Sequence, residues 1–111
     1  FTERLINAHT NPEVWAQQQA HLQEMVDWAK AHDAQMMVLL WPQIAMIEDS
    51  QPAVERVTGL FNELGITVVD MSEPLRAYDT SQLIVNRFDT HPSVLANRLA
   101  ADELYAVLGE E

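Results

Sequence analysis

The chain has 111 residues, 48% hydrophobic and 21% charged, a composition that fits one globular domain and excludes a disordered chain. Seventeen acidic against six basic side chains give a net charge of −11, which disfavours nucleic acid and anionic membrane surfaces as partners. The lack of cysteine excludes disulfides and thiolate metal sites, and no apolar run is long enough to predict a membrane span.

The first predicted element is a helix over about residues 12–32. Asn11 is a good cap residue, Pro12 suits the first helical position, and Glu13 puts an acid in the first turn. Apolar residues at helical spacing predict the face that packs on the core, namely Trp15, Leu22, Met25, Val26 and Ala29. We expect Trp28 to lie either in the core or in an interface.

An apolar run over 36–41, closed by Pro42, predicts a strand buried on both faces, as in a parallel sheet. The connection that follows, 43–51, is unusually apolar for a loop. Two interpretations of its apolar side chains stay open: they line a pocket for an acyl chain, or they pack beneath the loop as a small satellite core. The pocket candidates are Pro42, Ile44, Met46 and Ile47.

A second helix is predicted to begin at Pro52 and to end at Gly65, which serves as a C-terminal cap. A second short strand follows over 66–70. The remaining predicted elements are a short helical turn, a brief extended piece and a final helix, over 72–78, 83–85 and 92–108.

This order of elements, with strands alternating with helices, indicates a layered α/β fold with a parallel sheet. Two strong strands are too few for such a sheet, because they leave unpaired edges and half-covered helix faces. We therefore expect residues 1–111 to form a single α/β unit, a partial three-layer α/β/α arrangement of flavodoxin-like type. Its sheet edge is expected to pair with a missing N-terminal half or with a second copy of the chain.

The segment around Asp89 and His91 holds the strongest candidate site. Residues i and i+2 of an extended segment point the same way, so the carboxylate can orient the imidazole. Such a pair is two-thirds of a Ser-His-Asp arrangement, although an acid before a helix is often only a cap. Ligands of open parallel sheets bind beyond the carboxyl ends of the strands, where we also place the loop after Pro42 and Asp70.

The segment Asp89-Thr90-His91-Pro92-Ser93 and the Ala-rich helix after it resemble the C-terminal block of the SGNH hydrolases, the GDSL-type esterase and lipase superfamily. The upstream helices and strands resemble the later βα units of that family, so the resemblance covers nearly the whole chain. It implies that His91 is the general base and Asp89 its orienting acid. The implied reaction is hydrolysis of a carboxylic ester, thioester or acetyl ester through an acyl-enzyme, with no metal or organic cofactor.

The chain departs from that family at the nucleophile. It has no Gly-Asp-Ser motif and no Gly-x-Asn-Asp motif, and Gly-Asp precedes none of its serines, which are Ser50, Ser72, Ser81 and Ser93. We therefore expect the nucleophile to lie outside this chain, which would be the C-terminal part of a larger hydrolase domain and inactive alone. The alternative is a non-catalytic α/β interaction or oligomerisation module. No spacing of possible ligands predicts a metal site.

Overall fold

The structure is a computed structural model that describes residues 11–109. These residues divide into two compact units: residues 11–38 and 52–68 belong to the first, and residues 39–51 and 69–109 to the second. The chain crosses between the units three times: inside the strands β1 (Met37–Leu40) and β2 (Thr67–Asp70), and at the start of helix α3 (Gln51–Glu63). Helices and strands both contribute, so the protein is of the α/β class.

The first unit opens with helix α2 (Pro12–Ala31), which confirms the predicted helix. Asn11 caps its start, because the side-chain oxygen accepts hydrogen bonds from the N–H groups of Glu13 and Val14 at 3.0 and 3.3 Å. At its end Asp33 takes the left-handed conformation, with φ of 53°, and the Ala34 N–H donates to the Ala29 carbonyl at 2.8 Å. This Schellman pattern satisfies the last carbonyls of the helix.

The buried face of α2 is narrower than its apolar pattern predicts. Val26 and Ala29 are buried as expected, whereas Met25 and Trp28 are 55% and 62% exposed. The core assignment was therefore wrong for Met25, and the core alternative for Trp28 is wrong as well. The apolar residues of α2 form two stripes, and the helix buries only the stripe with Val26 and Ala29. The stripe with Met25 and Trp28 is exposed.

Helix α3 (Gln51–Glu63) contributes Val54, Leu60 and Phe61 to the buried core. Gly65 follows the helix with φ of 74°, and the Ile66 N–H donates to the Phe61 carbonyl at 2.9 Å. The predicted C-terminal cap is therefore confirmed, since glycine enters this left-handed region without the cost that a Cβ atom brings.

Substitution of alanine for Gly59 of α3 and for Gly65 of its cap should change the free energy of unfolding in opposite directions. Gly65→Ala is expected to lower the free energy of unfolding by about 1 kcal/mol because of its positive φ. Gly59 lies inside α3 with open space around it, so Gly59→Ala should raise that free energy by about 0.5–1 kcal/mol. Urea denaturation of both variants measures this, and shifts of the same sign would contradict the assigned backbone conformations.

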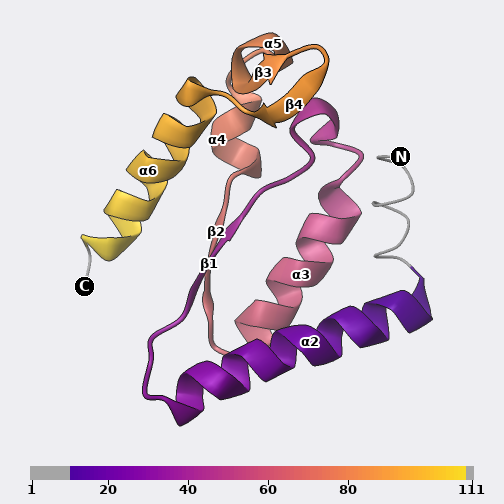
Figure 1. Cartoon of the computed structure of the whole chain (residues 1–111), viewed down its shortest axis with the longest axis vertical. Helices are drawn as coiled ribbons and strands as arrows, with labels where there is room; N and C mark the ends of the chain where they lie inside the picture. Colours follow the sequence, from indigo (N-terminus) through magenta and orange to yellow (C-terminus); the bar gives the residue numbers. More distant parts are fainter. Residues whose placement is uncertain (1–10, 110–111) are drawn as a thin grey trace. The chain divides into compact units, whose positions relative to one another are not determined.

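Strands β1 and β2 pair in a small parallel sheet and run side by side in Figure 1. All residues of β1 are half-buried, so the prediction of a strand buried on both faces was wrong. In β2 only Val69 is buried. Among the described residues the sheet has no third strand, and this accounts for the partial exposure of both strands. In the same part of the chain, no helix combines the length and the apolar character needed to cross a membrane.

The second unit is built around a set of buried apolar residues, Ile44, Val69, Met71, Leu75, Leu83, Ala96 and Ala100. Its elements after β2 are α4 (Ser72–Arg76), α5 (Thr80–Leu83), β3 (Ile84–Asn86), β4 (Asp89–Pro92) and α6 (Val94–Leu108), and a 3₁₀ turn η1 (Ile44–Met46) precedes α3. Strands β3 and β4 form an antiparallel hairpin with Ile84 opposite Pro92. The sequence predicted an extended piece near β3 but no hairpin.

The start of α6 differs from the sequence-based prediction. Pro92 was expected to open the helix, but it ends β4, and the helix begins at Val94. Ser93 is the cap: its hydroxyl accepts the Ala96 N–H at 3.2 Å and donates to the Gln82 carbonyl at 2.7 Å. A serine that can satisfy the first free N–H groups fixes the helix start more firmly than the neighbouring proline.

Candidate functional site

Strand β4 brings Asp89 and His91 into direct contact. The ring nitrogen Nδ1 of His91 lies 2.5 Å from Oδ1 of Asp89. The same carboxylate oxygen accepts the backbone N–H of His91 at 3.1 Å. The His91 side chain is 86% exposed, so the carboxylate fixes one edge of the ring while the other edge faces solvent.

The turn of the β3–β4 hairpin positions the carboxylate. The side-chain oxygen of Asn86 accepts the N–H of Phe88 at 2.8 Å and the N–H of Asp89 at 3.0 Å. An asparagine that bonds the backbone two and three residues ahead makes a compact turn by itself. Asn86 was not singled out in the sequence, although asparagine after a short apolar segment is a recognised turn signal.

The electrostatics of the pair favour an ionised Asp89. The hydrogen bond from the His91 side chain, followed by the one from its backbone, holds the pKa of Asp89 below its ordinary value of 3.8. The contact between Asp89 and His91 therefore stabilises the fold at pH values above the ordinary pKa of Asp89. This contribution is lost as the pH falls through the lowered pKa of Asp89. A carboxylate next to Nδ1 selects the tautomer with the proton on Nδ1, so that Nε2 of the neutral ring is a proton acceptor.

A small open hollow lies beside His91 within the second unit. It has a volume of about 310 Å³ and is lined by Trp41, Pro42, Gln43, Ile44, Thr90, His91 and Pro92. Of the pocket candidates, Pro42 and Ile44 are among the lining residues, and Met46 and Ile47 are not. Ile44 is only 6% exposed, so it borders the hollow while it also belongs to the core.

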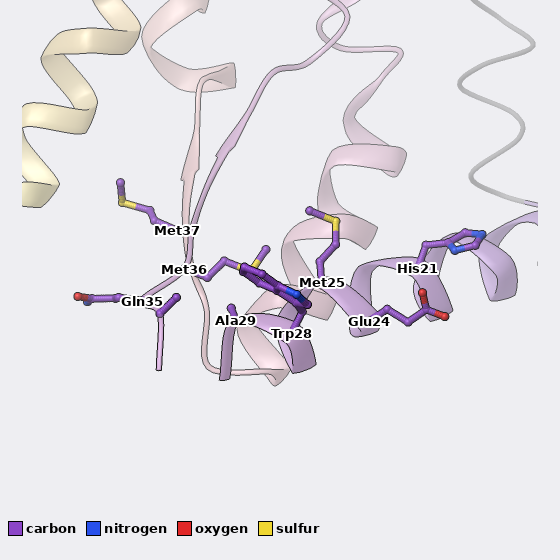
Figure 2. A pocket seen from close by; sticks show the side chains of 9 residues that line it. His21, Glu24, Met25, Trp28, Ala29, Gln35, Met36 and Met37 are labelled. Atoms are coloured by element: carbon purple, nitrogen blue, oxygen red, sulfur yellow. The ribbon is translucent and has the colours of Figure 1, made fainter. Parts of the chain in front are cut away.

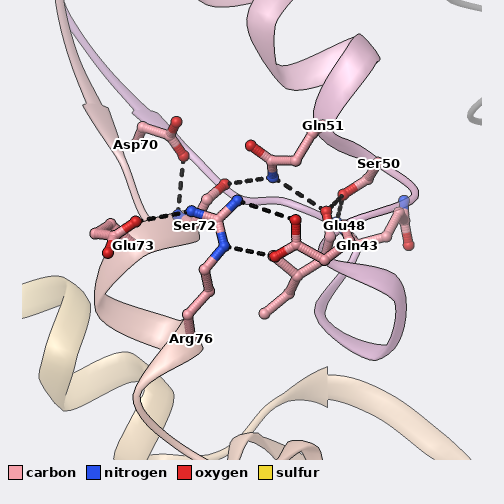
Figure 3. A network of polar contacts seen from close by, with 9 residues as sticks. Gln43, Glu48, Ser50, Gln51, Asp70, Ser72, Glu73 and Arg76 are labelled. Carbon is pink, nitrogen blue, oxygen red and sulfur yellow. Dashed lines mark hydrogen bonds and ion pairs between the residues drawn. The ribbon is translucent and has the colours of Figure 1, made fainter.

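A polar network fastens the connection that follows Pro42 to α4 (Figure 3). Arg76 pairs with Glu48 at 2.6 Å and with Glu73 at 2.8 Å. The side-chain amide of Gln51 donates to the hydroxyl of Ser72 at 3.0 Å and to the carbonyl of Ile47 at 3.0 Å. The network therefore orders the segment that supplies one wall of the hollow. No sequence pattern predicted it, because Arg76 lies far from Glu48 in the chain and Gln51 lies far from Ser72.

Three of the serines are held by structural hydrogen bonds. Ser50 donates to the Ile47 carbonyl and accepts the Gln43 N–H, while Ser72 is 2% exposed and accepts from Gln51. Ser93 caps α6, and Ser81 lies exposed in α5. Asp70, the other residue at a strand end, accepts the Ser72 N–H at 2.9 Å and acts as a turn-former. Within residues 11–109 no serine is hydrogen-bonded to His91.

Comparison of the chain with protein-family models, with curated protein sequences and with solved structures finds no match. The described residues also contain no group of three or more His, Asp or Glu side chains that could hold a metal ion. The chemical features of the site are the contact between Asp89 and His91 and the hollow next to it.

Proposed function

We propose that this chain contributes the Asp-His half of the Ser-His-Asp site of an ester hydrolase, whose serine lies on residues outside the chain. The observation that carries the proposal is the 2.5 Å contact between Asp89 Oδ1 and His91 Nδ1, which leaves Nε2 free at a largely exposed ring. In such a site the carboxylate holds the tautomer, and Nε2 takes the proton of the attacking serine. His91 is then the general base and Asp89 its orienting acid.

In the proposed reaction, the serine oxygen attacks the ester carbonyl while its proton moves to Nε2 of His91. Asp89 stabilises the imidazolium that forms. His91 then gives that proton to the departing alkoxide, and an acyl-enzyme remains. Water attacks the acyl carbonyl while His91 takes its proton, and His91 then returns that proton to the serine oxygen as the acyl–oxygen bond breaks and the acid leaves. The hollow of about 310 Å³ beside His91, lined in part by Pro42 and Ile44, suits a small acyl or alcohol group.

The fold part of this proposal is a flavodoxin-like three-layer arrangement, of which this chain would be the C-terminal portion, as in the SGNH hydrolases that it resembles. Its support is the two-stranded parallel sheet, in which all residues of β1 are only half-buried. The missing strands would come from an N-terminal half that also carries the serine. The substrate would be a small-molecule ester.

The proposal can be tested with a fluorophosphonate label and with p-nitrophenyl acetate. We expect the polypeptide encoded by the complete reading frame to be labelled on a serine outside the 111 residues. We expect the isolated chain to hydrolyse the ester no faster than free imidazole at the same concentration. Turnover by the isolated chain that His91→Ala abolishes would place the nucleophile inside it, with Ser81 the first candidate. A complete polypeptide with neither labelling nor turnover would exclude a serine hydrolase.

A further inference from the structure

An open apolar groove lies between α2 and the start of β1, in the first unit. Its floor and walls include Met25, Trp28, Ala29 and Met36, and its volume is about 850 Å³. Figure 2 shows the side chains of Met25, Trp28 and Met36 gathered there. A contiguous apolar surface of this kind is costly to leave in water, and it commonly marks an interaction site.

The aromatic part of the groove is held in place before anything binds. The ring of Trp28 stacks on that of His32, with centroids 4.0 Å apart and planes inclined by 21°. His32 is itself tied to the helix end through its Nδ1, 2.8 Å from the Trp28 carbonyl. Little side-chain freedom of Trp28 would thus be lost on binding, whereas Met25 and Met36 are flexible enough to fit different apolar partners.

The arrangement of the exposed residues favours a helix as the occupant. His21, Met25 and Trp28 follow one another at intervals of four and three residues and line the same groove. Such a row forms a ridge along one face of α2, and a second helix can pack its own apolar side chains against a ridge of that kind.

The charges around the groove favour a basic partner over a second copy of this chain. Glu24 lies on the rim and Asp27 is exposed on the same helix, whose only lysine or arginine is Lys30. The chain as a whole carries a net charge of −11, so two copies repel one another while a cationic segment is attracted. We propose that this groove docks a positively charged amphipathic helix of a partner protein.

The probe is a dye-labelled 14-residue peptide of leucine and lysine, with leucine at helical spacing, measured by fluorescence anisotropy. We expect the double variant Met25→Ala/Trp28→Ala to bind it at least about tenfold more weakly than the unaltered chain, as for the central residues of an interface. Tyr105→Ala is the matched control, because Tyr105 is 80% exposed on α6 and should leave binding unchanged. His91→Ala should also leave it unchanged, which separates this surface from the proposed esterase site.

Two further peptides test whether binding depends on the helical spacing of the leucines and on the positive charge of the probe peptide. A peptide of the same composition with its leucines out of helical register, and one with glutamate in place of lysine, should both bind at least about tenfold more weakly. Equal binding by the double variant, or by the glutamate peptide, would overturn the proposal. So would a dimer of the chain, seen in sedimentation without peptide, that the double variant dissociates, because the occupant would then be a second copy.

Discussion

His91→Ala, in the polypeptide encoded by the complete reading frame, is expected to lower kcat/KM for p-nitrophenyl acetate by about 10⁴-fold or more. In the proposed mechanism His91 accepts the proton of the serine, so without the imidazole only binding and stabilisation of the oxyanion would remain. The side chain is 86% exposed, so its removal should change the free energy of unfolding by less than about 0.5 kcal/mol. Loss of activity would therefore not be a loss of folding.

Asp89→Asn is expected to lower kcat/KM by about 10³-fold, which is a smaller loss than that expected for His91→Ala. An asparagine amide that donates to Nδ1 puts the ring proton on Nε2, which can then no longer accept the proton of the serine. His32→Ala is the matched control: it removes another exposed imidazole, one bonded to the Trp28 carbonyl on α2, and should retain activity. A His91→Ala enzyme with more than about a tenth of the original kcat/KM would contradict the role given to His91.

Leu83→Ala is expected to lower the free energy of unfolding by about 2–5 kcal/mol. The Leu83 side chain is 0% exposed, and it lies at the junction of α5 with β3. Its carbonyl also accepts the N–H of Ser93 at 2.8 Å, next to the start of α6. The substitution thus leaves a cavity in the core of the second unit, at the residue that directly precedes β3, and such a loss is a large share of the stability of a small protein.

Leu108→Ala makes the matched control for that experiment, because Leu108 is 56% exposed near the end of α6. It should change the free energy of unfolding by less than about 0.5 kcal/mol in the same urea titration. If Leu83→Ala were as mild as Leu108→Ala, the hairpin would not depend on the buried core of the second unit. The positioning of the candidate site by that core would then be wrong.

The sequence was a good guide to the helices, because their ends are set by local contacts. The cap at Asn11 acts on N–H groups two and three residues away, and Gly65 supplies a backbone conformation that few other residues adopt easily. The contact between Asp89 and His91 is local in the same sense, since any extended segment places residues i and i+2 on one side.

The hairpin and its neighbours were much harder to predict. Strands β3 and β4 are short, so their apolar pattern is weak, and their pairing depends on the partner strand and on the turn at Asn86. Helix α5 was missed although Asp79 and Gln82 form a capping box, because a single turn has no apolar period to reveal it.

The sequence by itself determined the α/β class, the ends of α2 and the alignment of Asp89 with His91, because caps and strand alternation act within a few residues. Only the tertiary structure decided that Met25 and Trp28 stay exposed, and that Pro42 and Ile44 border a hollow with His91. The bond between Arg76 and Glu48 spans 28 residues of sequence. Such contacts depend on which faces the folded chain brings together, and no local pattern encodes that choice.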